Sequence, residues 1–146
     1  MLKTKVKHRE IGREKALQLL YQRELSRSEI DKVIDYFEFG EIPDDAVLYA
    51  IDLFEKIEKN KEEIDEVIKN HLIKWEWNRI LPVDRNILRI GTYELLYRKD
   101  IPTGAIIDQA VRLAKRFGGY EDSFRFINGI LGRIADEVRS EEKDRS

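Results

Sequence analysis

The chain has 146 residues, a mass of 17.3 kDa and a net charge of −2, which is the size of a single domain. Hydrophobic residues make up 42% and charged residues 38%. No apolar run approaches the roughly 20 residues that span a bilayer, so the composition excludes a membrane protein and a disordered chain and favours a cytoplasmic one. Because there are no cysteines and only two histidines, His8 and His71, thiolate catalysis is excluded and we expect no metal and no cofactor.

Apolar residues recur at helical spacing through most of the chain, and no stretch alternates between apolar and polar residues as a strand does. This pattern predicts an all-α protein of about seven helices in two packed small bundles. A first helix is expected over about 9–25, preceded by lysines in a flexible arm. A short second helix is expected to begin at Ser28 and to end at Gly40, and a third to begin at Pro43, because these residue types favour helix ends.

Four more helices are expected from Asn60 onward. Asn60 suits the N-cap of the first of them, and Asp65 and Lys69 have the spacing of an ion pair on its exposed face. The other three are expected to begin at Pro82, at Pro102, and at Asp122 or Ser123.

A break in the helical pattern at 76–82 is the expected boundary between two parts of the molecule. It separates helical subdomains over about 9–75 and 82–139, which together with a charged tail at 140–146 form one domain over 1–146. No linker or internal repeat interrupts this organisation.

Positive charge is concentrated at the start of the chain. Residues 1–15 contain six basic side chains against two acidic ones, whereas residues 29–66 contain fourteen acidic side chains against four lysines. Arg9 and Arg13 are four residues apart and therefore share a face of the first helix. Such a cluster is typical of a site for a polyanion such as a nucleic-acid backbone, and a solvated helix start is the alternative interpretation.

Two aromatic residues would add base stacking to this charge if they are exposed. Tyr21 lies two turns beyond Arg13 on the same stripe, and Phe126 follows Asp122 by one helical turn. An exposed ring stacks well on a nucleic-acid base, although this spacing by itself is more typical of core residues. The composition therefore permits RNA binding without establishing it.

Catalysis has little support in the sequence. The acidic residues follow the spacing of solvated helix surfaces, and neither GxxxxGK[ST] nor GxGxxG is present. We therefore expect a protein that is not an enzyme.

Four blocks of sequence occur in the order and spacing of one family. They are GREKALQLLYQ at 12–22, VDRNILRIGTYELL at 83–96, IPTGAIIDQAVRLAKRFGG at 101–119 and FINGIL at 126–131. Over most of its length the chain thus resembles the NusB family of bacterial transcription antitermination factors.

The resemblance implies a non-catalytic, all-helical protein that pairs with NusE, a small-subunit ribosomal protein. The pair would bind single-stranded boxA RNA within the RNA polymerase antitermination complex and so promote transcription of ribosomal RNA. Carried over by motif and by the basic start of the first helix, the residues expected to bind RNA are Lys7, Arg9, Arg13, Tyr21, Asp84, Asp122 and Phe126.

Some of these residues also have a purely structural interpretation. Asp84 suits the first turn of a helix and Asp122 suits an N-cap, and each role is compatible with RNA binding. Gly12 stands where the family often has alanine, which should weaken the start of the first helix. Tyr120 looks like an added residue in the turn before Asp122.

Two other functions stay open at this stage. One is a helical adaptor that binds only protein, and the other is the RNA-binding module of an RNA-modifying enzyme. A homodimer of the free protein is also left open, and the high charge with no cysteine leans towards a thermophilic source.

Overall fold

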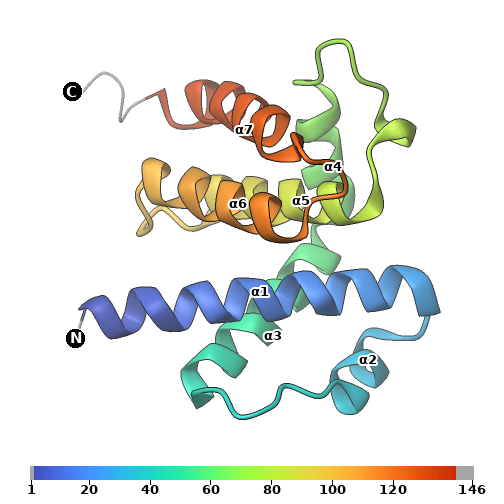
Figure 1. Ribbon diagram of the computed structural model, residues 1–146, viewed down its shortest axis with the longest axis vertical. Helices are drawn as coiled ribbons and strands as arrows, with labels where there is room; N and C mark the ends of the chain where they lie inside the picture. Colours follow the sequence, from blue (N-terminus) through green and yellow to red (C-terminus); the bar gives the residue numbers. More distant parts are fainter. Residues whose placement is uncertain (1, 141–146) are drawn as a thin grey trace. The chain divides into compact units, whose positions relative to one another are not determined.

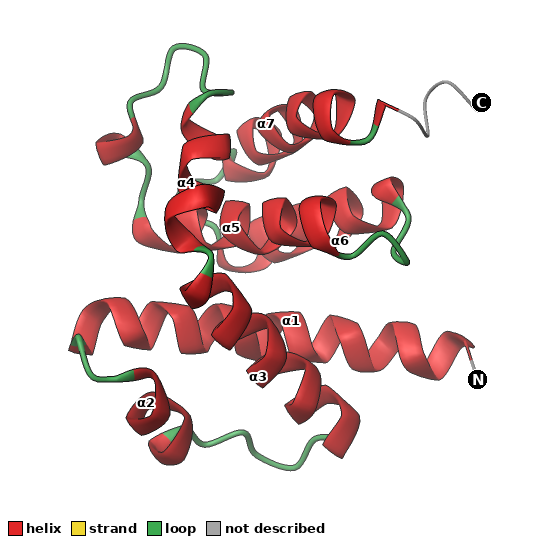
Figure 2. Cartoon of the chain, turned by 180° about the vertical axis from the view of Figure 1, so that it is seen from behind, coloured by secondary structure: helices red, strands yellow, loops and turns green. Residues whose placement is uncertain are grey.

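The computed structural model describes residues 2–140, which form seven α-helices, one short 3-10 helix and no strands (Figures 1 and 2). The predicted all-α fold is confirmed. The elements are α1 (Leu2–Ser26), α2 (Ile30–Tyr36), α3 (Asp44–Lys59), α4 (Lys61–Lys69), η1 (Trp77–Arg79), α5 (Pro82–Tyr97), α6 (Thr103–Phe117) and α7 (Ser123–Val138). Among these helices none combines the length and apolar character needed to cross a membrane. Of the expected tail at 140–146, all but Ser140 lie outside the described residues.

The lysines at the start of the chain are helical, so the prediction of a flexible arm before residue 9 was wrong. α1 begins at Leu2 and runs for 25 residues. No glycine or proline interrupts residues 2–11, and lysine, arginine and glutamate are good helix formers. Helical propensity therefore extends the helix through a polar segment that contributes nothing to the core.

The second and third helices differ in how well their ends were predicted. α2 begins after Glu29 and ends at Tyr36, whereas the predicted helix ran from Ser28 to Gly40. Gly40 lies in the following loop with a φ of 74°, a left-handed conformation that glycine adopts without strain. The predicted start of the third helix is confirmed, because α3 begins directly after Pro43.

The chain divides into two compact units after Lys59, so the predicted boundary at 76–82 was wrong. Side chains of α4 bind α5, the central helix of the second unit. Arg89 donates to both carboxylate oxygens of Asp65, at 2.8 and 3.0 Å, and the hydroxyl of Tyr97 donates to Glu63 at 2.6 Å. The carboxylate of Glu63 also stabilises the protonated phenol and raises the pKa of Tyr97 to about 12.

The ion pair predicted on α4 is also different in the structure. Asp65 binds Arg89 rather than Lys69, and Lys69 lies 3.9 Å from Glu66. Because Asp65 is on the side of α4 that packs against α5, a partner 24 residues away is closer than the one on its own helix.

In the first unit, α3 crosses α1 (Figure 1), and Gly12 lies at the crossing. A Cβ on Gly12 would lie 3.0 Å from Cδ2 of Tyr49 and 3.1 Å from the carbonyl oxygen of Ala46. The missing side chain at Gly12 thus allows close packing, which offsets its poor helix propensity. The core is formed by apolar residues of all three helices: Ala16, Leu17, Leu19, Leu20, Val33, Ala46, Ala50, Leu53, Phe54 and Ile57.

In the second unit, α5 is buried on nearly every side. It packs against α4, α6 and α7, and its residues 86–95 are all buried. A Cβ on Gly91 would lie 2.7 Å from Cδ1 of Leu131, so a side chain at this position would displace Leu131 where α5 meets α7. The surrounding helices contribute the rest of this core: Ile64, Ile68, Ile106, Ala110, Leu113, Ala114, Ile127, Ile130, Leu131 and Ile134.

Candidate nucleic-acid interface

The first two turns of α1 carry Lys3, Lys5 and Lys7, which we call the lysine segment. All three are exposed, and no acidic residue lies in the first turn of the helix. Within residues 2–140, none of the three forms an ion pair. Positive charge at a helix N-terminus opposes the helix dipole, so the lysine segment is a surface that an external anion would stabilise.

Arg9 and Arg13 lie on one face of α1, as predicted, and both are placed against the ring of Tyr49. Their guanidinium carbons lie 5.8 Å and 5.7 Å from the ring centroid, within the range of a cation–π interaction. Arg9 is half-buried, whereas Arg13 is only 3% exposed. The structure therefore offers Arg9 to an external phosphate, and Arg13 acts inside the fold, where it packs on Tyr49.

Tyr21 lies further along α1 and is 39% exposed. The spacing of the sequence favoured a core position, and the structure instead places this ring at the surface. Its neighbours Ala16, Leu17, Leu19 and Leu20 supply the buried side of the helix. Tyr21 is thus available for stacking on a base.

Asp84 is fully buried in the first turn of α5. One carboxylate oxygen accepts a hydrogen bond from the backbone N–H of Gly119 at 3.0 Å, and the other accepts one from the hydroxyl of Ser123 at 2.9 Å. The Ser123 hydroxyl accepts in turn from the N–H of Tyr120 at 2.9 Å. The direct RNA contact expected for Asp84 is not available in this structure, because the carboxylate instead holds the turn between α6 and α7.

Burial removes the Asp84 carboxylate from water and thereby raises its pKa. The hydrogen bonds from Gly119 and Ser123 favour the charged form and offset part of that effect. The geometry therefore gives Asp84 a positioning role in the turn that precedes α7.

Asp122 occupies the N-cap position of α7, but its side chain makes no capping hydrogen bond. Only its backbone carbonyl serves the helix, by accepting from the N–H of Arg125 at 3.0 Å. The carboxylate is exposed, so the purely structural interpretation of Asp122 was wrong. Its carboxylate lies at the surface, two residues after the exposed Tyr120.

Phe126 is half-buried on α7 and stacks on Trp75, which comes from the loop between α4 and α5. The ring centroids are 5.3 Å apart and the planes are inclined by 27°. Trp75 is 43% exposed. Sequence reasoning did not select Trp75, although a tryptophan in a loop outside the helical pattern is a signal that would have justified it.

Replacing Asp84 by alanine tests its role in the turn. Asp84→Ala leaves the Gly119 N–H and the Ser123 hydroxyl without their acceptors, which should lower the free energy of unfolding by about 1–3 kcal/mol. The matched control is Asp122→Ala, an exposed carboxylate of the same turn, which should change it by less than about 0.5 kcal/mol. Urea denaturation followed by circular dichroism measures both, and equal effects would contradict the role of Asp84.

The raised pKa of Asp84 also predicts a pH dependence. The folded protein keeps the Asp84 proton at pH values where the unfolded chain, with the ordinary value of 3.8, has released it. The tighter binding of this proton stabilises the folded state. Its contribution to the free energy of unfolding is fully present below pH 3.8 and is lost as the pH rises through the raised pKa of Asp84. Relative to Asp84→Asn, which does not titrate, the wild type should therefore lose free energy of unfolding as the pH rises through that window. The opposite slope would show that the hydrogen bonds outweigh burial.

The described residues thus define a class: an all-helical protein of two units, with an unpaired lysine segment on one and an exposed aromatic stack on the other. The NusB family model matches residues 10–136. The transcription antitermination protein NusB of Myxococcus xanthus (strain DK1622) is 40% identical over 132 residues, which cover 87% of this chain and 94% of that relative. The chain belongs to the NusB family, as its four motifs predicted.

Solved structures agree with this assignment. The T. maritima NusB structure has a TM-score of 0.82 and 38% sequence identity, and the match covers 94% of this chain and 97% of that one. A chain in the crystal structure of the antitermination factors NusB and NusE in complex with dsRNA has a TM-score of 0.76 and 30% identity, covering 89% of this chain and 97% of that one.

Proposed function

We propose that this protein is a transcription antitermination factor that binds RNA together with NusE. Family membership supports the antitermination role, since the curated relatives carry that name. A solved complex of a relative contains both NusE and RNA. The observation that carries RNA binding for this chain is the lysine segment, because three exposed lysines with no carboxylate partner among residues 2–140 suit a phosphate backbone.

The RNA-binding role of individual residues follows from their exposure. Lys7, Arg9 and Tyr21 of α1 contact the RNA directly, and so does Asp122 of the second unit. Phe126 contributes through its stack with Trp75. A carboxylate such as Asp122 repels phosphate but accepts hydrogen bonds from the amino groups of unpaired bases. The buried residues Arg13 and Asp84 act by positioning these groups.

The protein acts without catalysis, in the cytoplasm, as part of the RNA polymerase antitermination complex. The RNA of the solved relative is double-stranded, whereas the family resemblance implies single-stranded boxA RNA. Reading bases on their Watson–Crick edges requires unpaired nucleotides, so we propose that the single-stranded form binds more tightly. Both forms are therefore included in the test.

Neutralising the lysine segment tests this function. The triple variant Lys3→Gln, Lys5→Gln and Lys7→Gln should weaken RNA binding and reduce the magnitude of the salt slope by about 2, since each phosphate contact on a single strand contributes about 0.7. Fluorescence anisotropy of labelled boxA RNA, single-stranded and as a duplex, measures affinity over a range of salt concentrations with and without NusE.

A matched control removes the same charge elsewhere. Lys32, Lys56 and Lys59 are exposed lysines within residues 29–66, where acidic side chains predominate. Replacing all three by glutamine should leave the salt slope unchanged. If the wild type with NusE binds RNA no better than the triple variant at any salt concentration, RNA binding by this surface is refuted. The protein-only adaptor then becomes the better interpretation.

A further inference from the structure

The Trp75–Phe126 stack presents one of its rings to solvent. Trp75 covers one face of the Phe126 ring: the two ring centroids are 5.3 Å apart and the planes are inclined by 27°. A base cannot stack on that face unless Trp75 moves. Trp75 itself keeps 43% of its surface exposed, although burying an indole is strongly favourable. The accessible ring of this pair is therefore Trp75.

The loop that carries Trp75 is anchored on its C-terminal side by the second tryptophan. Three cations surround the ring of Trp77: Lys69 at 5.4 Å, Arg85 at 5.6 Å and Arg89 at 5.4 Å from the centroid. Each distance is within the range of a cation–π interaction. Trp77 thus has a structural role, whereas Trp75, two residues earlier, is the more exposed of the two tryptophans.

The loop is anchored on its N-terminal side at His71. One ring nitrogen of His71 contacts the carbonyl oxygen of Val67 at 2.7 Å, and the other contacts the carboxylate of Glu137 on α7. The backbone carbonyl of His71 accepts from the guanidinium of Arg133 at 3.1 Å. Lys74, directly before Trp75, has a φ of 66°, a conformation that needs support from surrounding contacts. The position of Trp75 is therefore set before any ligand binds.

We propose that Trp75 is a base-stacking residue: one unpaired RNA base lies on its exposed face and extends the Trp75–Phe126 pair to a stack of three rings. This proposal rests on the RNA-binding function proposed above. A ring held in place loses little entropy when a base binds, and stacking tolerates any base. Exposed cations flank the pair in sequence, since Lys74 precedes Trp75 and Arg125 precedes Phe126, and they suit the phosphates on either side of a stacked base.

Affinity measurements on the full chain with NusE test the stacking. Trp75→Ala should weaken binding of single-stranded boxA RNA by about 5- to 150-fold, the range for loss of one base–aromatic stack. The salt slope should not change, because an indole neutralises no phosphate. Trp75→Phe keeps a stacking ring and should retain most of the affinity. Since Phe126 acts behind Trp75, Phe126→Ala should cause little further loss in the Trp75→Ala background.

Fluorescence reports on the ring itself, because the chain contains only two tryptophans. Trp77→Phe leaves Trp75 as the sole indole, and its emission should be quenched when single-stranded RNA is added at low salt without NusE. Trp75→Phe leaves Trp77, whose emission RNA should not quench. Circular dichroism confirms that each variant is folded.

The possible failures are distinguishable. If Trp75→Ala binds RNA as the wild type does, while the lysine-segment variant loses affinity, the stacking proposal is overturned and the proposed function stands. If Trp75→Ala loses NusE but keeps RNA affinity, Trp75 is a protein contact and the proposal is also overturned. If the wild type binds no RNA at any salt concentration, both proposals fail.

Discussion

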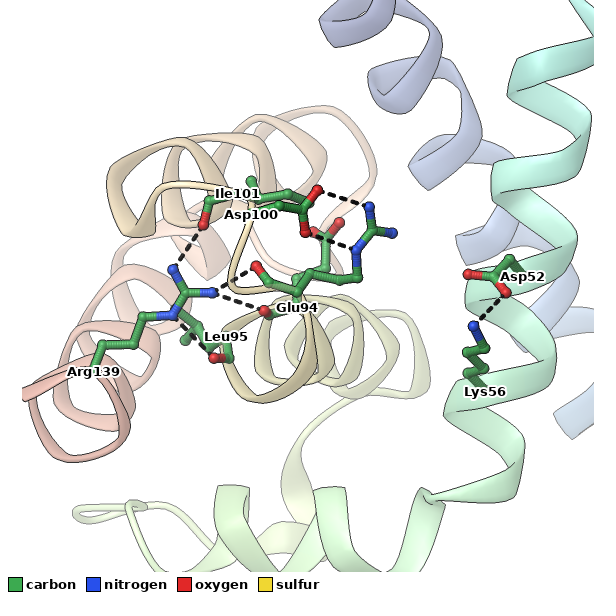
Figure 3. Close-up of polar contacts among 8 residues, drawn as sticks. Asp52, Lys56, Glu94, Leu95, Asp100, Ile101 and Arg139 are labelled. Carbon is green, nitrogen blue, oxygen red and sulfur yellow. Dashed lines mark hydrogen bonds and ion pairs between the residues drawn. The ribbon is translucent and has the colours of Figure 1, made fainter. Parts of the chain in front are cut away.

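Arg139→Ala should lower the free energy of unfolding by about 3–5 kcal/mol, the largest loss that we expect from a single side chain of this protein. The guanidinium of Arg139 is directed at the C-terminal end of α5 (Figure 3). It donates to the backbone carbonyls of Glu94 at 3.0 Å, Leu95 at 3.0 Å, Arg98 at 2.9 Å and Ile101 at 2.7 Å. The carbonyls of Glu94 and Arg98 also accept from the backbone N–H groups of Arg98 and Ile101, so at these two the guanidinium adds a second hydrogen bond. Each hydrogen bond to the charged guanidinium contributes about 1 kcal/mol or more.

Two substitutions separate the hydrogen bonds of Arg139 from its packing. Arg139→Met keeps an apolar stem of similar length, so a loss close to that of Arg139→Ala would assign the stabilisation to the guanidinium. Arg139→Lys keeps the charge but reaches fewer carbonyls, and it should recover about half of the loss. The measurement is urea denaturation followed by circular dichroism.

The control is Arg112→Ala, which removes an arginine from an exposed ion pair with Asp108 on α6. Such pairs contribute well under about 1 kcal/mol. If Arg139→Ala lowers the free energy of unfolding no more than Arg112→Ala does, water replaces the guanidinium at the end of α5 and Arg139 does not cap this helix.

Asp65→Ala should lower the free energy of unfolding by about 3 kcal/mol, because it leaves the guanidinium of Arg89 buried without its carboxylate. The side chains of Arg89 and Asp65 are 5% and 17% exposed, so water cannot replace the lost partner fully. The hydrogen bond from Arg89 to the side-chain oxygen of Asn86, at 2.8 Å, does not replace a carboxylate. Asp65→Asn preserves the shape of the side chain and one hydrogen-bond acceptor for Arg89, so it should lower the free energy of unfolding by less.

Urea denaturation of matched variants tests the Asp65 prediction. Asp52→Ala breaks the exposed pair with Lys56 on α3 (Figure 3) and should cost less than about 0.5 kcal/mol. The double variant Asp65→Leu with Arg89→Met replaces the buried pair by apolar groups and should recover most of the stability lost in Asp65→Ala. A double variant that is less stable than Asp65→Ala would contradict this account.

The candidate site was predictable where a residue's role depends on its own helix. Lys7, Arg9, Tyr21, Asp122 and Phe126 were selected from charge, spacing and family motifs, and the structure leaves each of them at least partly accessible. Their chemistry follows from residue type and from position along a helix. Their action on RNA stays a prediction until binding is measured.

Two predicted site residues and one missed residue show what spacing cannot reveal. Arg13 and Asp84 were expected to be accessible, but Tyr49 packs on the first, and Gly119 and Ser123 bind the second. Trp75 follows no helical pattern, and its importance comes from Phe126, about 50 residues further along the chain. Each outcome depends on a partner that is distant in sequence.

By itself the sequence determined the helical class, the starts of α3, α5 and α6, the basic charge of α1 and the membership of the NusB family. These features depend on proline and capping signals, on the periodicity of apolar residues and on local composition, all of which act within a few residues. Only the tertiary structure decided where the chain divides, which ion pairs form and which rings are exposed. Asp65 with Arg89, and Arg139 with the end of α5, are pairings across distant parts of the chain, and folding selects them because a buried charge must find a partner wherever packing places one.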